Sequence, residues 1–184
     1  AIWRRYDGSN DIIQTRSRTD GGATWSSVVD LSATGQNAYE PQIAAAPNNT
    51  LTAIWRRYDG SNDIIQTRSR TDGGATWSSV VDLSATGENA DNPQIAAAPN
   101  NTLTAIWRRY DGSNDIIQTR SRTDGGATWS SVVDLSATGQ NAYEPQIAAA
   151  PNNTLTAIWR RYDGSNYIIQ TRSSTDGGAT WSSV

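Results

Sequence analysis

Residues 51–58 read Leu-Thr-Ala-Ile-Trp-Arg-Arg-Tyr, and the spacing of the apolar residues in this stretch decides the fold class. Side chains of an extended chain point alternately to opposite sides, so Leu51, Ala53 and Trp55 share one face and Ile54 lies on the other. A period of two among β-branched and aromatic residues predicts a β-strand. The sequence carries no i, i+3, i+4 apolar pattern long enough for a helix, so we expect an all-β protein.

The same unit predicts three further strands, separated by turn-forming residues. Pro47-Asn-Asn, Asp59-Gly-Ser-Asn and Asp72-Gly-Gly-Ala are typical turn sequences, and short connections between strands favour antiparallel pairing. The unit is therefore predicted to be a four-stranded antiparallel meander. In chain order, the predicted strands cover 41–46, 51–58, 63–69 and 77–83.

One unit is repeated through the whole chain with a period of 52 residues. Residues 1–52 and 105–156 are identical, the copy at 53–104 differs at three positions, and the partial copy at 157–184 differs at two. We expect a single repeat array over 1–184, produced by recent duplication or by design. The deviating residues are Glu88, Asp91, Asn92, Tyr167 and Ser174.

A meander with apolar side chains on both faces can bury them if other copies of the repeat pack against it. Repeats of this size bury both faces by stacking or by radial arrangement, and four strands per repeat favour a β-propeller blade. A two-sheet sandwich and an open solenoid are the alternatives.

The turn between the third and fourth strands carries a known motif. The last copy reads Ser174-Thr-Asp-Gly-Gly-Ala-Thr-Trp181, which matches the Asp-box pattern S-x-D-x-G-x-T-W. The chain therefore resembles the Asp-box (BNR-repeat) propellers of the sialidase-like class. The other copies have Arg18, Arg70 and Arg122 where the pattern has Ser. The motif recurs in every copy, so the resemblance covers the whole chain.

The resemblance implies that the Asp-boxes are structural and lie away from the ligand site. Their residue types agree, because Asp accepts backbone N–H bonds in a turn, Gly adopts positive φ, and Trp packs between sheets. The expected Asp-box residues are Asp20, Gly22, Thr24, Trp25, Asp72, Gly74, Thr76, Trp77, Asp124, Gly126, Thr128, Trp129, Ser174, Asp176, Gly178, Thr180 and Trp181.

The resemblance also implies a catalytic site that this sequence does not reproduce. Sialidases use an arginine triad, a tyrosine with a supporting glutamate, and an acidic aspartate, with the first arginine usually in an R-I-P motif. This chain has no R-I-P motif, and its near-identical copies cannot supply an asymmetric site except around a shared axis. We therefore expect no enzyme activity and no catalytic residues, with a sialidase-like glycoside hydrolase relic or fragment as one alternative.

Composition excludes several other classes of protein. All 15 cations are arginines against 18 acidic residues, a formal charge of −3, which argues against a nucleic-acid partner. His and Cys are absent, so the commonest general base and the commonest transition-metal ligands are missing. No apolar run is long enough to cross a membrane. We expect no cofactor and no metal.

Three weaker signals have structural explanations. Residues 6–11, Tyr-Asp-Gly-Ser-Asn-Asp, offer oxygen ligands for Ca²⁺ but lack EF-hand spacing, so a hairpin turn is favoured. Residues 3–6, Trp-Arg-Arg-Tyr, resemble a single-strand nucleic-acid platform, but the acidic balance favours arginines paired with aspartates. Asn48, Asn100 and Asn152 begin N-x-T sequons, which matter only in a glycosylating secretory pathway.

A ligand is expected on the face opposite the Asp-boxes. In an up-and-down meander, the turn between strands two and three and the linker between units share that face, and most differences between copies fall there. Tyrosine rings suit pyranose stacking and polar groups suit sugar hydroxyls, so the hypothesis is multivalent, lectin-like carbohydrate binding by a non-catalytic scaffold. A designed symmetric propeller without a natural ligand is the remaining alternative. The candidate ligand-binding residues are Tyr6, Asp7, Asn37, Tyr39, Glu40, Tyr143 and Glu144.

The register of the two ends leads us to expect self-association. The chain starts within the second strand of a unit and stops early in a fourth strand, so both ends lack a complete blade. Unpaired strand edges associate, so a dimer or larger homo-oligomer is expected to complete the ring. The absence of Met indicates a processed product or a portion of a longer array. The family resemblance suggests a secreted bacterial protein.

Overall fold

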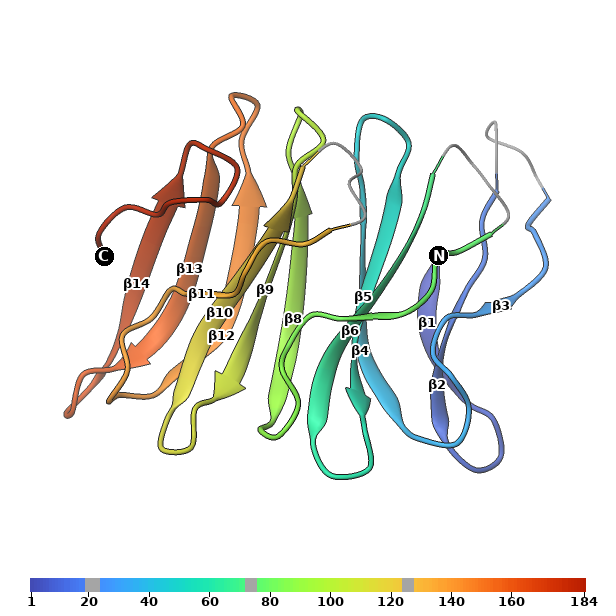
Figure 1. Ribbon diagram of the computed structural model, residues 1–184, viewed down its shortest axis with the longest axis horizontal. Coiled ribbons are helices and arrows are strands. Elements are labelled where there is room, and N and C mark those ends of the chain that lie inside the picture. The colour runs from blue at the N-terminus through green and yellow to red at the C-terminus, as the bar shows by residue number, and fades with distance from the viewer. Residues whose placement is uncertain (19–23, 72–75, 124–127) are drawn as a thin grey trace.

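Four antiparallel sheets stand side by side in one row, and the two termini lie at opposite ends of that row (Figure 1). The computed structural model describes residues 1–18, 24–71, 76–123 and 128–184, and its secondary structure in these ranges is β throughout. Each sheet comes from one unit of the repeat, with its strands in chain order across the sheet. The predicted all-β propeller architecture is confirmed as an arc of blades.

The two central sheets have four strands and the two terminal sheets have three. The first sheet contains β1 (Ile2–Tyr6), β2 (Asp11–Thr15) and β3 (Val29–Asp30). The second contains β4 (Ala38–Ala45), β5 (Leu51–Tyr58), β6 (Asp63–Arg70) and β7 (Val81–Asp82). The third contains β8 (Ala90–Ala97), β9 (Leu103–Tyr110), β10 (Asp115–Arg122) and β11 (Val133–Asp134). The fourth contains β12 (Ala142–Ala149), β13 (Leu155–Tyr162) and β14 (Tyr167–Ser174).

The hairpin of strands two and three forms as the sequence predicts. In the second sheet, β5 and β6 pair without interruption from Leu51 opposite Arg70 to Tyr58 opposite Asp63. The Asp59 carboxylate closes the turn by accepting the backbone N–H groups of Ser61 and Asn62, both at 2.8 Å. This Asx closure fixes the register of the hairpin.

Strand one is longer than predicted, because a β-bulge carries the chain past Pro41. β4 begins at Ala38, and its pairing with β5 shifts register between Tyr39 and Gln42. Glu40 has φ 54° at this bulge, and the extra residue lets the strand continue although Pro41 donates no ladder hydrogen bond. The prediction that put Tyr39 and Glu40 in the linker between blades is therefore wrong.

Strand four is much shorter than the predicted 77–83. Only Val81 and Asp82 pair with β6, opposite Thr67 and Gln66. Upstream, one backbone hydrogen bond remains, from the Ser78 N–H to the Ser69 carbonyl at 2.7 Å. Side chains supplement it: the Ser69 N–H donates to Ser78 Oγ at 3.1 Å, and Arg68 Nε donates to the Ser78 carbonyl at 2.6 Å. A serine and an arginine thus take part in the pairing at the outer edge.

The hydrophobic core lies between neighbouring sheets. Between the second and third sheets, Ile54, Ile65 and Leu83 pack against Trp107 and Trp129, among other residues of the third sheet. The equivalent residues of the other units form the two remaining cores. Each junction therefore joins an Ile-Ile-Leu face to an Ala-Trp face, and this alternation is the one that the strand period predicts.

The sheets are arranged radially, because their first strands converge. β4 lies beside β8, and β8 lies beside β12. The ends of these three strands surround one opening of about 400 Å³, whose lining includes Ala45, Ala97 and Ala149. Sheets stacked in a flat pile, as in a solenoid, or facing each other in a sandwich, would not bring three first strands to one opening.

The Asp-box turn of the last copy is closed by its own polar side chains. The Asp176 carboxylate accepts the Ser174 hydroxyl at 2.8 Å, the Thr180 hydroxyl at 2.5 Å, and the Thr180 N–H at 3.0 and 3.1 Å. Gly178 has φ 89°, and a Cβ there would collide with the Ser121 side chain of the third sheet. The turn therefore packs closely on the preceding blade.

The other Asp-boxes are described only in part. Asp20, Gly22, Asp72, Gly74, Asp124 and Gly126 lie outside the described residues. Of the tryptophans, Trp77 and Trp129 are buried between sheets, Trp181 is partly buried against the third sheet, and Trp25 of the first sheet is 39% exposed. In the described residues, no helix is long and apolar enough to cross a membrane.

Candidate functional site

A row of charged and aromatic side chains runs across the face opposite the Asp-box turns. We call it the arginine row, and it is built on one arginine from the second strand of each repeat unit, which is β1 in the first sheet and β5, β9 and β13 in the others: Arg4, Arg56, Arg108 and Arg160. These arginines lie two residues before the tyrosine that ends the strand, beside the turn between strands two and three. Figure 1 shows these turns along one edge of the molecule.

The strand register explains the first cluster of the row. Arg56 on β5 lies directly opposite Tyr39 on β4, and its guanidinium carbon is 4.9 Å from the centre of the Tyr39 ring. Arg56 also forms ion pairs with Asp63 at 3.3 Å and with Glu40 at 3.7 Å. From the preceding sheet, Arg4 approaches the same ring to 5.4 Å. Tyr39 is therefore in contact with arginines of two neighbouring blades.

The same arrangement recurs between the third and fourth sheets. The Tyr143 ring lies 5.5 Å from the guanidinium carbon of Arg108 and 5.6 Å from that of Arg160. Tyr167 stands where the other copies have aspartate, and its ring is 4.3 Å from the Arg160 guanidinium carbon. The Tyr143 and Tyr167 rings meet edge to face at 6.2 Å. This end of the row is consequently the richest in aromatic surface.

The middle of the row has a carboxylate in place of a tyrosine. Asp91, at the position equivalent to Tyr39, binds Arg108 through two hydrogen bonds. This contact raises the pKa of Arg108 above its usual value. Arg108 also pairs with Asp115 at 3.5 Å, and burial raises the pKa of the Asp115 carboxyl although Arg108 opposes the shift.

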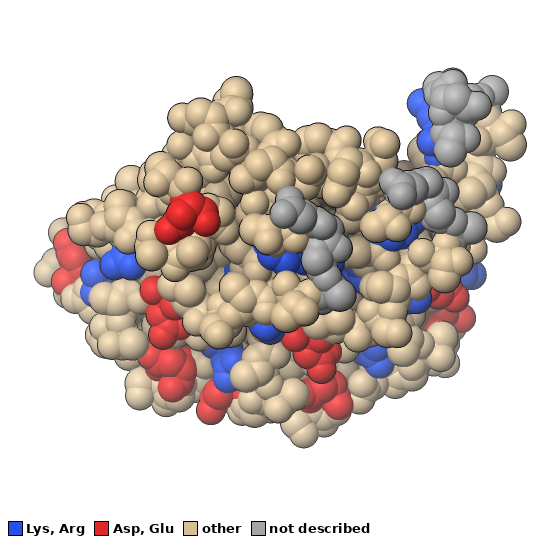
Figure 2. Space-filling model, turned by 45° about the horizontal axis from the view of Figure 1, so that its top comes forward, with Lys and Arg blue, Asp and Glu red and all other residues tan. Residues whose placement is uncertain are grey.

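Every arginine of the row forms an ion pair with a carboxylate. Each of the four arginines has at least one carboxylate within 4.0 Å, so the row has no excess of positive charge. Figure 2, in which the side of the Asp-box turns comes forward, shows basic and acidic side chains interspersed over that part of the surface as well. The carboxylates that pair with these arginines are Asp11, Glu40, Asp63, Asp91, Asp115 and Glu144.

The structure brings four of the seven predicted ligand residues into this row: Tyr39, Glu40, Tyr143 and Glu144. The other three have contacts within the scaffold. Tyr6 donates its hydroxyl to the Gly8 carbonyl at 3.0 Å, and Asp7 accepts two backbone N–H groups of its own turn. Asn37 accepts the Asp11 N–H at 2.9 Å, which ties the linker to the preceding sheet.

The sequence led us to expect that the arginines of residues 3–6 pair with aspartates, but it did not assign these arginines or their partners to the ligand site. Their positions repeat in every copy, so no single residue stood out by spacing. One available signal was that the deviating residues Asp91 and Tyr167 both lie beside row arginines. Differences between copies therefore gather at the row. The sequence alone does not explain this, because the pairing of residues across neighbouring strands is known only from the structure.

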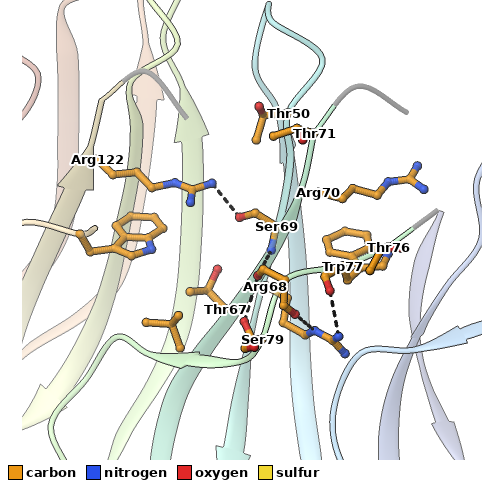
Figure 3. A pocket seen from close by; sticks show the side chains of 13 residues that line it. Thr50, Thr67, Arg68, Ser69, Arg70, Thr71, Thr76, Trp77, Ser79 and Arg122 are labelled. Carbon is orange, nitrogen blue, oxygen red and sulfur yellow. Dashed lines mark hydrogen bonds between the residues drawn. The ribbon is translucent and has the colours of Figure 1, made fainter. Parts of the chain in front are cut away.

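A second hollow lies on the opposite side, between the second and third sheets. It encloses about 510 Å³, and Arg70, Trp77, Arg122 and Trp129 are among the residues that line it. Figure 3 shows the Arg122 guanidinium reaching across it to Ser69. Arg122 also donates to Thr52 at 2.7 Å, and its guanidinium carbon lies 5.2 Å from the Trp129 ring centre. These contacts hold two blades together.

The turn at residues 6–11 is closed by hydrogen bonds, as the hairpin interpretation requires. Asp7 Oδ1 accepts the N–H groups of Ser9 and Asn10, and these bonds hold the pKa of Asp7 below its ordinary value. Among the described residues, no three acidic side chains are grouped so that they could hold a metal ion.

No protein-family profile matches the chain, and no curated protein matches its sequence. Solved structures, by contrast, share its fold. The GH93 α-L-arabinofuranosidase of Fusarium graminearum, solved with arabinobiose, aligns over 95% of this chain and 58% of its own, with TM-score 0.60 and 18% identity. The α-L-arabinanase of Penicillium chrysogenum, also with arabinobiose, aligns over 93% and 58%, with TM-score 0.60 and 15% identity.

A protein of unknown function from Dyadobacter fermentans aligns over 94% of this chain and 49% of its own, with TM-score 0.64 and 16% identity. The chain thus spans about half to three fifths of the length of these structures. At this identity the likeness establishes a propeller fold.

The comparisons correct one expectation from the sequence. We expected no enzyme activity, and this is contradicted by the finding that two of these structures are glycoside hydrolases. The near-identity of the copies does not make all junctions alike, because a few deviating residues, such as Asp91 and Tyr167, give them different chemistry. The comparisons support a propeller fold in general and do not single out the Asp-box, sialidase-like class.

Proposed function

We propose that the arginine row binds carbohydrate, and that the preferred ligand is a neutral oligosaccharide. The observation that carries this proposal is the pair of tyrosines, Tyr39 and Tyr143, each partly exposed and each in contact with arginines of two neighbouring blades. A ring fixed in this way offers a flat apolar surface for a sugar, and the flanking carboxylates accept its hydroxyl groups.

The charge of the row favours a neutral sugar over an acidic one. An acidic sugar needs arginines that are free to pair with its carboxylate, as in the sialidase triad. Here every row arginine already has a carboxylate partner, and Arg56 and Arg108 each have two. An incoming carboxylate would meet these acidic groups, whereas hydroxyl groups can donate to them. Two of the similar structures were solved with arabinobiose, a neutral disaccharide.

Calorimetric titration with neutral arabino-oligosaccharides tests the proposal. The wild-type chain should bind, and Tyr39→Ala combined with Tyr143→Ala should weaken binding at least tenfold, since each site loses its stacking surface and avidity is lost as well. Tyr6→Ala, which removes an exposed tyrosine outside the row, is the matched control and should leave binding unchanged. A folded wild-type chain that binds neither these sugars nor any neutral glycan on an array would refute the proposal.

Asp91→Tyr offers a test in the opposite direction. This substitution gives the third sheet the tyrosine found at the same position in the second and fourth sheets, and should add a third stacking surface. We expect tighter binding of long oligosaccharides than in the wild type. Weaker binding would show that Asp91, and not a tyrosine, is the group that the sugar uses at this junction.

Hydrolysis of a glycosidic bond is a second candidate function, favoured by the environment of Asp115. Glycoside hydrolases use two carboxyl groups whose environments separate their pKa values, one acting as the acid. Burial raises the pKa of the Asp115 carboxyl, and the Asp91 carboxylate, which accepts hydrogen bonds from Arg108, is the second acidic group of the cluster. Release of nitrophenol from nitrophenyl arabinofuranoside tests it: Asp115→Asn should abolish release while sugar binding persists. Wild-type protein that binds arabinan fragments without cleaving them would refute this role.

We also propose that the chain is an Asp-box propeller and that it is secreted. The closed Asp176 turn supports membership of the Asp-box class, because the side chains of the motif make the hydrogen bonds that its residue types suggest. A carbohydrate-binding propeller without cysteine fits an extracellular role, and secretion is inferred on that ground alone.

A further inference from the structure

We infer that the open face of the fourth sheet binds the open face of the first sheet of a second copy of this chain, head to tail. The inference rests on the three junctions inside the chain, which all use the same residues of the repeat. Each junction joins what we call the tail face of one sheet to the head face of the next. Among the described residues, no sheet packs on the tail face of the fourth sheet or on the head face of the first sheet.

The tail face of the fourth sheet exposes isoleucines that are buried in the other sheets. Ile158 is 41% exposed, whereas its equivalents Ile54 and Ile106 are fully buried. Ile169 is 67% exposed, whereas its equivalents, Ile13, Ile65 and Ile117, are all fully buried. Exposed apolar groups of this kind on a sheet face mark an association surface. At the junctions inside the chain, the head face of the next sheet buries the equivalent isoleucines.

The head face of the first sheet supplies the complementary residues. In the second and third sheets, Trp77 and Trp129 are 5% exposed because they insert against the preceding tail face, whereas Trp25 of the first sheet is 39% exposed. Trp3 is only partly buried, whereas its equivalent Trp55 is fully buried in a junction. The first sheet thus offers the tryptophans that a tail face receives.

A polar contact repeats at the junctions and defines the orientation. Arg70 donates to Ser17 of the preceding sheet at 2.5 Å, and Arg122 donates to Ser69 at 2.6 Å. Arg18 and Ser173 occupy the equivalent positions on the two open faces. In the head-to-tail pairing, Arg18 of one copy reaches Ser173 of the other, which a tail-to-tail or head-to-head pairing cannot provide.

The pairing would also extend the arginine row. Within the chain, arginines of two neighbouring sheets contact the same residue of the row, as Arg4 and Arg56 both contact Tyr39. Across the new junction, Arg160 and Tyr167 of one copy would lie next to Arg4 of the other. The second copy therefore adds to the proposed binding face, although the pairing itself does not depend on carbohydrate.

Light scattering with two complementary variants tests this inference. The wild-type chain, 19.9 kDa as a monomer, should associate into a dimer or a larger assembly. Ile158→Asp with Ile169→Asp blocks the tail, Trp3→Asp with Trp25→Asp blocks the head, and each variant alone should be monomeric. Mixed in equal amounts, they should form a dimer, because one intact tail and one intact head remain. This recovery on mixing is specific to a heterologous interface.

Val80→Asp is the matched control. Val80 is 39% exposed, similar to Ile158, but lies on a sheet with neighbours on both sides, so this substitution should not change the mass measured by light scattering.

If the head variant does not fold, Arg18→Ala replaces it and should weaken association without touching the tryptophans. A wild-type chain that stays monomeric at high micromolar concentration would overturn the inference. So would association that persists in both blocked variants, or blocked variants that fail to pair while the wild type associates. Sugar binding by a monomer would leave the proposed function standing.

Discussion

At the scale of single residues, the repeat shows what one substitution does in an otherwise constant setting. Position 18 of the unit is arginine in three copies and serine in the last. The arginines of the second and third sheets cross to the neighbouring sheet, whereas Ser174 folds back on its own turn and donates to Asp176. The same backbone position thus serves either the junction between blades or the turn itself.

Asp176 gives the turn of the last copy a dependence on pH. The Thr180 hydroxyl, the Thr180 N–H and the Ser174 hydroxyl hold the pKa of Asp176 well below its ordinary value of 3.8. The folded state therefore binds this proton less readily than the unfolded state, so the stabilisation is complete above about pH 5 and is lost as pH falls through the folded-state pKa.

Melting temperatures of the wild type and Asp176→Asn between pH 7 and pH 2 test this assignment. The wild type should melt higher at neutral pH, and the gap should narrow towards pH 2, because a protonated Asp176 is no better an acceptor than an amide. Glu88→Gln, which installs the residue of the other copies, should show no such convergence. A gap that stays constant to pH 2 would contradict the assigned hydrogen bonds.

At the scale of strands, the features that follow from alternating apolar residues were predicted correctly. The features that depend on hydrogen bonds between side chains and the backbone were not. The hairpin of β5 and β6 forms at the predicted residues because its pattern and its turn are local. The bulge at Glu40 and the shortened β7 could not be predicted, since they depend on contacts such as that between Arg68 and the Ser78 carbonyl.

The candidate site was predicted in part for the same reason. Its face followed from the connectivity of the meander, and Tyr39 and Tyr143 followed from residue type. The partners of these tyrosines could not be found from the sequence, because Arg4 and Arg56 meet around Tyr39 only when two blades pack side by side. The spacing of residues along the sequence is the same in every copy, so it does not reveal contacts between equivalent positions of different copies.

The junctions between sheets can be tested by substituting equivalent isoleucines. Ile54→Ala removes a fully buried side chain from a junction and should cost about 2–5 kcal/mol of unfolding free energy. Ile158→Ala changes the same residue of the repeat where it is 41% exposed, and should change stability by about 0.5 kcal/mol or less.

Urea denaturation at concentrations where the chain is monomeric measures both variants. Equal losses for Ile54→Ala and Ile158→Ala would mean that burial between sheets does not distinguish the two positions, and that the fourth sheet has a neighbour within the same molecule.

At the scale of the whole molecule, the radial arrangement is the feature on which both proposals depend. It gathers the inner strands β4, β8 and β12 around one opening, places the arginines of successive blades beside the same tyrosines, and leaves complementary faces at the two ends of the arc. A flat stack of the same four sheets would bury similar residues but would not bring the second and fourth sheets together at their inner edges.

Two distances between spin labels test the radial arrangement most directly, and the absence of cysteine makes the labelling specific. One pair replaces Ala45 and Ala149 at the inner ends of the second and fourth sheets, and the other replaces Ser79 and Ser183 at their outer edges. Both pairs join equivalent residues of the repeat, and dilution with unlabelled chain removes distances between copies. The account predicts a clearly shorter distance for the inner pair than for the outer pair. Equal distances of about 20 Å, the spacing of two successive stacked sheets, would contradict it.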